Sequence, residues 1–229
     1  MQYRFFYFTK LNHNHLTSCT NGFKIALNGA NTGVGGENVA RNTKDVIYLG
    51  AIEAFSELGF SATTMDTIAE KSGVVKRTLY YNFQTKEELF SYVMQRSAEE
   101  LEKLLDGALS KHTDFKQKWH NVVDAHLSFY SKNSSVFHLI IQQIWKKDIH
   151  ASFSIHHLFK NYFTRLDLEI ENDKSNQNIA GDLDQFTCSA SIFGMITIPV
   201  ARAILNGQPI YTEKRVQTIS NMILNSFGE

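Results

Sequence analysis

Cations and tyrosines are concentrated in one short stretch of the sequence, SGVVKRTLYYNFQTKEELF, which covers Ser72–Phe90. It contains Lys76 and Arg77, followed closely by Tyr80 and Tyr81. Lysine and arginine side chains donate hydrogen bonds to guanine edges and phosphates, while tyrosines bind phosphate oxygens and contact thymine methyl groups. These residue types, placed close together, are typical of a surface that contacts double-stranded DNA.

A helix over Val75–Phe83 would turn the polar side chains of this stretch toward one side. At about 100° per residue, Val75, Leu79 and Phe83 fall within one apolar sector. Arg77 and the two tyrosines fall on the opposite side, and Lys76 lies at the border. The sequence therefore predicts a helix that is anchored by three apolar side chains and presents its polar face outward.

A second helix and a turn precede this segment. In the stretch TTMDTIAEKSGV, Thr64 is the predicted N-cap and Gly73 lies at a turn that needs a left-handed backbone. Lys86 begins the next helix, where Thr85 and Glu88 have the spacing of a capping box. Together these elements predict a helix-turn-helix unit, with Thr64 and Lys86 at the edges of the DNA contact.

The segment FSATTMDTIAEKSGVVKRTLYYNFQTKEELF resembles the DNA-binding signature of the TetR/AcrR family of transcriptional regulators, over about residues 44–92. The shared pattern comprises TT-M-x-x-IA-x-x-x-GV, then TLYYNF, then KEEL. Val75 departs from this pattern, because the family usually has serine or a similar capping residue there. Asn82 stands where histidine is commoner, which is a milder change because both side chains can bind a phosphate.

The resemblance also implies which residues bind DNA and what the rest of the chain does. After about residue 92 it implies a divergent, all-helical region that binds a small-molecule effector and forms a homodimer. A two-fold dimer suits a palindromic operator, because its two recognition helices enter successive major grooves. The implied base contacts are made by Lys76, Arg77 and Tyr81, and the implied phosphate contacts by Thr64, Thr78, Tyr80, Asn82 and Lys86.

Composition narrows the class of protein. The 229 residues are 43% hydrophobic and include only 2 prolines, which favours long helices around a core over a loop-rich β architecture. The formal net charge is zero, so binding to an anionic partner must depend on local charge. Two distant cysteines, Cys19 and Cys188, suit a reducing compartment, and we expect a cytoplasmic protein. The apolar segment CSASIFGMITIPVA is too short to predict a membrane span.

Residues 1–42 differ from the rest of the chain, because they are rich in glycine and asparagine and have no helical period. We expect a disordered leader, since this composition cannot bury a core. The alternative is an arm that contacts DNA, because four cations outnumber the single acid Glu37. These cations are Arg4, Lys10, Lys24 and Arg41.

From Thr43 onward, apolar residues recur at helical spacing, so the predicted fold class is all-α. Residues 43–92 form the predicted three-helix, helix-turn-helix DNA-binding domain, and residues 93–229 a larger helical effector-binding and dimerisation domain. Gly59 and Gly107 are predicted to end the first and fourth helices. Further helices are predicted at about 113–131, 134–147, 150–171, 181–206 and 212–227.

The last two predicted helices could form a dimer interface. The first contains small residues that allow close approach of another helix, together with Pro199. Its partner carries an apolar stripe. The alternative is that both helices close the core of one subunit. The small residues are Ser189, Ala190, Ser191, Gly194 and Ala201, and the stripe is Val216, Ile219, Ile223 and Phe227.

Aromatic residues provide the candidate walls of an apolar effector pocket, although such residues also form ordinary cores. His120 and Asp124 share one helix face, but no third ligand is identifiable for this pair. His150 lies near His156 and His157, but lone histidines on helices are usually hydrogen-bonded or solvated. We therefore predict no metal site and no cofactor. The candidate pocket residues are Trp119, Phe129, Phe137, Trp145 and Phe159.

The predicted function is that of a cytoplasmic, homodimeric transcriptional regulator, most simply a ligand-responsive repressor. One alternative is a helical adaptor that has lost sequence-specific DNA binding. Another is a helical metal-binding protein or enzyme. The sequence contains no Glu-x-x-His pair, nucleophile motif or phosphate loop, so we do not predict an enzyme.

Overall fold

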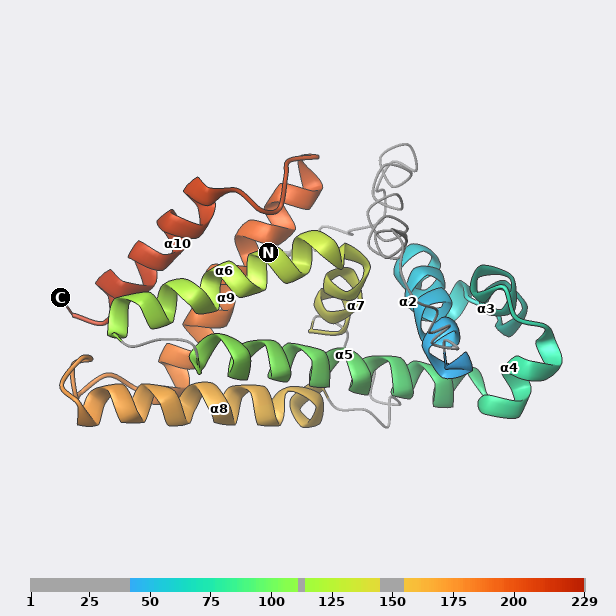
Figure 1. The fold of residues 1–229 in the computed structure, drawn as a ribbon, viewed down its shortest axis with the longest axis horizontal. Helices are drawn as coiled ribbons and strands as arrows, with labels where there is room; N and C mark the ends of the chain where they lie inside the picture. The colour runs from blue at the N-terminus through green and yellow to red at the C-terminus, as the bar shows by residue number, and fades with distance from the viewer. Residues whose placement is uncertain (1–41, 111–113, 145–154, 229) are drawn as a thin grey trace, which may run out of the picture. The chain divides into compact units, whose positions relative to one another are not determined.

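The computed structural model describes residues 42–110, 114–144 and 155–228, and every regular element in these ranges is an α-helix (Figure 1). This confirms the all-α fold class. The expectations for the leader up to residue 41 lie outside the described residues, as do those for Trp145 and His150. The helices are α2 (Thr43–Ala62), α3 (Met65–Ser72), α4 (Lys76–Asn82), α5 (Lys86–Leu109), α6 (Phe115–Lys132), α7 (Ser134–Ile144), α8 (Ile155–Ser175), α9 (Gln185–Leu205) and α10 (Glu213–Ser226).

Helix α2 forms because its apolar residues recur at helical spacing and Asn42 caps its first turn, accepting a hydrogen bond from the Lys44 amide. Ile47 and Phe55, two apolar residues at helical spacing, are fully buried, whereas the apolar Leu58 is 43% exposed. Gly59 has φ 75° and ψ 165°, so the helical path is interrupted there and then continues to Ala62. The predicted end at Gly59 is therefore a kink, which only glycine adopts without strain.

Helices α2 and α3 approach each other very closely. A Cβ atom built on Gly50 would lie 2.6 Å from the Ser72 amide nitrogen and 2.7 Å from the Ser72 Cα. The contact is reinforced by Lys71 on α3, whose Nζ lies 2.8 Å from Glu53 Oε1 and 2.9 Å from Glu57 Oε2 on α2. Glycine at position 50 thus allows α3 to pack against α2, and α3 in turn leads into α4.

Helix α5 connects the first three helices to the rest of the described chain (Figure 1). It starts with the predicted cap: Thr85 Oγ1 accepts from the Glu88 amide, and Glu88 accepts from the Gln84 amide. Near its middle, Arg96 donates to Asp45 of α2 at 2.5 Å. Helix α5 continues past Gly107 to Leu109, so the predicted stop at that glycine is wrong.

The helices after α5 pack around α6, which contacts α5, α7, α9 and α10, while α8 packs on α5 and α9. A buried ion network joins α6 to α8. Lys118 is only 3% exposed, and its ammonium group binds Glu169 at 2.6 Å and also Asp173. Trp119 Nε1 donates to the same Asp173 at 3.1 Å, and Arg165 binds Glu169 at 3.0 Å. The ammonium group of Lys118, which a helix would normally expose to solvent, is therefore neutralised by buried carboxylates.

Among the described residues, one helix, α9, is long and apolar enough by length and composition to cross a membrane, with mean hydropathy 1.7. The helix has 21 residues and is longer than the apolar segment recognised in the sequence. It runs through Pro199 without ending. Ile196 and Val200 are fully buried, and the helix packs against α6, α8 and α10. The apolar residues on one face of α9 therefore belong to the core of a helical bundle, which accounts for part of the helix's high hydropathy.

Candidate nucleic-acid interface

Helices α3 and α4 form the predicted helix-turn-helix. Thr64 caps α3 by accepting a hydrogen bond from the Thr67 amide at 3.1 Å. Gly73 ends α3 in the left-handed conformation, with φ 64° and ψ 23°, and its amide donates to the carbonyl of Glu70. A left-handed residue at this point turns the chain sharply from α3 into α4.

Helix α4 is held to the other helices by two apolar side chains. Leu79 is fully buried and Phe83 is 3% exposed, with its ring 5.1 Å from that of Tyr92 on α5. Val75 is 70% exposed, so its predicted place in the apolar sector is wrong. It lies at the N-cap position, just before the helix starts, and makes no side-chain capping hydrogen bond. The absence of that cap agrees with the departure from the family pattern.

The opposite side of α4 carries exposed polar side chains, as the sequence predicts. Tyr81 is 89% exposed and Tyr80 is 42% exposed, and both Lys76 and Arg77 are exposed. We call these four residues the outer face of α4. Lys76 lies 2.7 Å from Asp66 of α3, and the hydrogen bond to this carboxylate raises the pKa of the ammonium group. Since α4 itself contains no acidic residue, the outer face is locally positive in a chain of zero net charge.

The other four predicted DNA-binding residues already make hydrogen bonds within the chain; two are on α4, one caps α3 and one begins α5. Thr64 is exposed but occupied as the N-cap of α3. Thr78 and Asn82 are half-buried, and Asn82 Nδ2 donates to the Thr78 carbonyl at 2.8 Å. Lys86 Nζ donates to the carbonyl oxygens of Phe60 at 2.8 Å, Ser61 at 3.4 Å and Thr63 at 2.9 Å. An ammonium group has three donors, so Lys86 has little capacity left for another acceptor.

Sequence reasoning missed the close approach of Gly50 to Ser72, which sets the distance between α2 and α3. The signal was present, because an isolated glycine inside a helical pattern lowers helix stability and so points to a close contact at that position. It also missed Lys71, whose two ion pairs to Glu53 and Glu57 join α3 to α2.

A second candidate site lies in the C-terminal helices, where aromatic rings from α6, α7, α8 and α9 touch one another. Phe137 packs on Tyr130 at a centroid distance of 4.9 Å, and Phe159 packs on Phe193 at 5.9 Å. Of the predicted pocket residues, Phe129, Phe137 and Phe159 belong to this group. We define the aromatic cluster as His126, Phe129, Tyr130, Phe137, Phe159, Tyr162, Phe163 and Phe193.

Trp119 lies apart from the aromatic cluster. Its ring packs against Phe227 of the segment after α10, at 5.3 Å, and its indole nitrogen binds Asp173. Both interactions fix the indole in the core next to the Lys118 ion network. The structure therefore does not group Trp119 with the other predicted pocket residues, and Trp145 lies outside the described residues.

Polar atoms lie inside the aromatic cluster. His126 Nδ1 is 2.6 Å from the Val122 carbonyl, and His126 Nε2 is 2.9 Å from the Tyr162 hydroxyl. A carbonyl only accepts, so Nδ1 carries the proton and Nε2 accepts from Tyr162. Burial lowers the pKa of His126 to about 4, which keeps the imidazole neutral near pH 7. The Tyr130 hydroxyl is buried and has no hydrogen-bond partner among the described residues.

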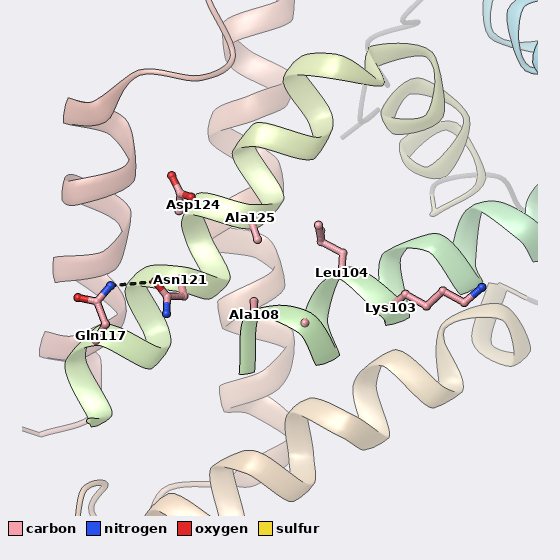
Figure 2. A pocket seen from close by; sticks show the side chains of 8 residues that line it. Lys103, Leu104, Ala108, Gln117, Asn121, Asp124 and Ala125 are labelled. Atoms are coloured by element: carbon pink, nitrogen blue, oxygen red, sulfur yellow. Dashed lines mark hydrogen bonds between the residues drawn. The ribbon is translucent and has the colours of Figure 1, made fainter. Parts of the chain in front are cut away.

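A groove of about 620 Å³ lies between α5 and α6 (Figure 2). Small side chains, Ala108 and Ala125, leave room for it, and Gln117 donates to Asn121 at its rim. Asp124 also lines the groove, but it accepts a hydrogen bond from the Tyr211 hydroxyl at 2.7 Å. None of the predicted pocket residues lines this groove.

Two of the candidate metal ligands, His120 and Asp124, have other hydrogen-bond partners. His120 Nδ1 lies 3.4 Å from the Ser220 hydroxyl, while Asp124 binds Tyr211. In the described part of the chain, no group of three histidine, cysteine, aspartate or glutamate side chains could hold a metal ion.

The apolar stripe of α10 is buried inside the subunit, so its predicted role in a dimer interface is wrong. Val216, Ile219 and Ile223 are at most 3% exposed, because α10 packs on α6. A different set of apolar residues is exposed on these helices. On α9, Phe186 is 77% exposed and Ile198 is 57% exposed, and Met222 on α10 is 53% exposed.

Comparison with known proteins identifies the class. Residues 47–93 match the bacterial regulatory proteins of the tetR family, and residues 93–226 match the C-terminal region of YsiA-like proteins. Because the two matches cover most of the chain, the protein belongs to the tetR family of bacterial regulatory proteins, as its sequence resemblance implied.

The similar proteins are transcriptional regulators, and one of them is named for fatty acid metabolism. The chain is 34% identical to the transcriptional activator FasR of Mycolicibacterium smegmatis over 96 residues, which span 42% of this chain and only 44% of FasR. It is 24% identical to the fatty acid metabolism regulator protein of Bacillus subtilis, over 69% of this chain and 81% of that protein. The structure of Bacillus subtilis FadR in complex with stearoyl-CoA superimposes with a TM-score of 0.67 at 21% identity, covering 80% of this chain and 96% of FadR.

Proposed function

We propose that the protein is a ligand-responsive transcriptional repressor that binds a palindromic DNA operator as a homodimer. The observation that carries this proposal is the outer face of α4, where Arg77 and Tyr81 project from a helix anchored by Leu79 and Phe83. A helix of this kind fits the major groove, which is wide enough to admit it and displays a distinct pattern of donors and acceptors for each base pair.

We assign base contacts to Lys76, Arg77 and Tyr81. Arginine can bind both acceptors of a guanine edge at once, and an exposed tyrosine ring can contact a thymine methyl group. Lys76 must exchange its ion pair with Asp66 for a DNA acceptor. That exchange costs little, because both side chains are solvent-exposed and such pairs are weak.

Phosphate contacts are assigned to Tyr80 of the outer face of α4, to Thr78 on the same helix, and to Thr64 at the start of α3. Asn82 and Lys86 have a different primary role in this proposal, since both bind backbone carbonyls. Lys86 holds the chain between α2 and α3 through the carbonyls of Phe60 and Thr63. Its effect on DNA binding is then indirect, through the position of α3.

The dimer interface is assigned to the exposed face of α9 together with Met222 of α10. On α9, Phe186, Ile198 and Leu205 are exposed apolar residues, and a Cβ atom on Gly194 would meet nothing within 4 Å. Exposed apolar residues beside small ones suit close helix packing between two subunits. The interface thus uses the same two helices that the sequence suggested, but on α10 it uses a residue beside the buried stripe and not the stripe itself.

The effector is assigned to the class of long-chain fatty acyl-CoA. Two observations support this assignment. The first is the similarity to the Bacillus subtilis fatty acid metabolism regulator protein and to FadR, whose structure contains stearoyl-CoA. The second is the aromatic cluster in the C-terminal helices. An acyl chain is apolar and would pack against aromatic rings. Helix α7 contributes Phe137 to the cluster and also packs on α2, so a ligand can shift the population of DNA-binding forms through α7.

In this proposal the protein acts in the cytoplasm and has no enzymatic activity. Selection of binding sites from a random duplex pool tests the proposal, using the purified full chain. We expect a two-fold symmetric motif whose half-sites are separated by about one helical turn or a multiple of it. Sequence-blind, salt-sensitive binding alone would instead support an adaptor without specific DNA recognition, for which the uncapped Val75 gives a structural reason.

The dimer interface can be tested separately with matched charge substitutions. Ile198→Asp should convert the dimer into a monomer in size-exclusion chromatography with light scattering, because a charge would be buried at the interface. Leu168→Asp is the control, since Leu168 on α8 is 60% exposed but lies outside the proposed interface. A monomeric wild type, or loss of the dimer only in the control, would contradict this assignment.

A further inference from the structure

The Tyr130 hydroxyl, on α6 in the aromatic cluster, is a hydrogen-bonding group without a partner among the described residues. The side chain is fully buried, and its oxygen has no partner in the described part of the chain. A buried hydroxyl without a hydrogen bond is unfavourable, and native proteins contain few of them. A tyrosine at this position therefore needs an explanation that packing alone does not give, because phenylalanine would fill the same space.

The neighbouring polar groups do not satisfy Tyr130, and their directions are fixed. His126 uses its Nδ1 proton on the Val122 carbonyl, and its Nε2 atom accepts from Tyr162. The Tyr162 hydroxyl has thus used its only proton. Of His126, Tyr130 and Tyr162, Tyr130 is therefore the residue whose proton has no acceptor among the described residues.

The surroundings of Tyr130 are apolar and aromatic. Its ring packs edge-on against Phe137 at 4.9 Å and against Phe129 at 5.7 Å. Phe129 and Phe163 are only partly buried, so the aromatic cluster reaches the protein surface at these two side chains. An apolar chain could enter there by rotation of the two rings and continue toward Tyr130.

We propose that the Tyr130 hydroxyl donates a hydrogen bond to the carbonyl oxygen of an uncharged acyl group, such as the thioester of a long-chain acyl-CoA. The acyl chain then lies along the rings of the aromatic cluster. This inference rests on the proposed function, because it specifies how the effector is recognised. It adds a distinction that the effector class alone does not contain: the site selects a neutral carbonyl over a free carboxylate.

The preference for a neutral group follows from the electrostatics of the cluster. Burial raises the pKa of Tyr130. The pKa of Tyr162 is also raised, mainly by burial and to a smaller extent by the nearby Tyr130. Burial also lowers the pKa of His126, which leaves it uncharged. Among the described residues, no cation offsets these effects. A carboxylate placed here would lose its hydration without gaining a counter-charge, whereas a thioester would gain a donor.

The test compares two ligands that differ in one oxygen atom. Stearoyl-CoA has the thioester carbonyl, while S-octadecyl-CoA is a thioether with the same chain length and no carbonyl. The full chain is titrated with each ligand by isothermal calorimetry, and with free stearate as a third ligand. We expect wild type to bind the thioester about tenfold more tightly than the thioether, as one buried hydrogen bond would give. Free stearate should bind more weakly than the thioester.

Tyr130→Phe removes only the hydroxyl. In this variant we expect the preference for the thioester over the thioether to disappear, while the melting temperature without ligand stays the same or rises, since an unpaired buried hydroxyl has been removed. Gly107→Leu is the control, because it adds a side chain to the groove between α5 and α6, where a Cβ atom meets nothing within 4 Å. This control should bind both ligands as wild type does.

The possible failures are distinguishable. If wild type binds neither CoA ligand yet still selects a DNA motif, the proposed effector class is wrong and the Tyr130 inference falls with it. If both ligands bind equally to wild type and to Tyr130→Phe, the effector class stands but the hydroxyl is not the anchor. If Gly107→Leu abolishes binding and Tyr130→Phe does not, the groove holds the effector. A large drop in melting temperature for Tyr130→Phe would mean that the hydroxyl has a structural partner, which also overturns the inference.

Discussion

The distance between α2 and α3 depends on the absence of a side chain at Gly50, and this can be tested with a single methyl group. In Gly50→Ala the new carbon would lie 2.6 Å from the Ser72 amide nitrogen and 2.7 Å from its Cα. Both neighbours are backbone atoms, which cannot rotate away as a flexible side chain could. Normal contacts between such atoms are about 3.5–4.0 Å, so α3 must move by about 1 Å relative to α2.

This movement should affect both stability and DNA binding. Overpacking in a close-packed core costs about 1–3 kcal/mol, which corresponds to a melting temperature lower by roughly 2–12 °C for a chain of this size. Because α4 follows α3 through the Gly73 turn, its outer face should be displaced as well. We expect the affinity for the selected operator to fall about tenfold or more, equivalent to losing one good base contact.

The assay pairs this variant with a second glycine-to-alanine change. Gly107→Ala lies in α5, where a Cβ atom meets nothing within 4 Å, so it should stabilise the helix by about 0.5–1 kcal/mol and leave operator affinity unchanged. Melting is followed by circular dichroism and operator affinity by fluorescence anisotropy. The reasoning would be refuted if Gly50→Ala had the melting temperature and operator affinity of wild type.

Three further predictions concern the buried ion network and a helix cap. Lys118→Met should lower the free energy of unfolding in urea by about 3–5 kcal/mol, because it removes the Lys118 cation from the buried carboxylate of Asp173, whereas Glu169 keeps Arg165. A loss below about 1 kcal/mol would contradict the network's role. Burial raises the pKa of Glu169, but hydrogen bonds from Lys118 and Arg165 outweigh it and lower the pKa overall, so this contribution to stability is present above about pH 4.3 and is lost as the pH falls through the folded-state pKa. Urea midpoints measured between pH 7 and pH 3 should therefore fall on acidification, and fall less in Lys118→Met. Thr64→Ala should cost about 1 kcal/mol of stability by removing the N-cap of α3, whereas Thr64→Ser should be close to wild type.

The helix-turn-helix was predictable because its determinants are local. Helical spacing identified Leu79 and Phe83 as anchors, and the caps at Thr64 and Thr85 formed as their sequence patterns indicate. The prediction for Val75 was wrong because it assumed that the helix already includes this residue. The helix begins one residue later, at Lys76, so the side chain of Val75 faces solvent.

The C-terminal half was less predictable because its contacts join residues that are distant in sequence. From the sequence alone, Lys118 would be expected at the surface. Only the fold brings it to the carboxylates of Glu169 and Asp173, which are 51 and 55 residues away in the sequence. The aromatic residues could be named as pocket candidates, but residue type did not separate Trp119, next to Phe227, from Phe137, next to Tyr130.

The apolar stripe of α10 shows the same limit. Its helical period identified a face that must be covered, but not by which part of the protein. In the structure α6 of the same subunit covers it. Exposure of the other apolar residues, such as Met222, depends on how α9 and α10 pack and has no signature in local sequence.

The central claim is that the outer face of α4 reads DNA bases, and the most direct measurement is a binding-site selection repeated with Arg77→Ala. If Arg77 contacts a base, the selected motif should stay two-fold symmetric but lose its preference at one position in each half-site, with a loss in affinity of about 1–3 kcal/mol. A motif identical to that of wild type, selected with equal affinity, would contradict the claim.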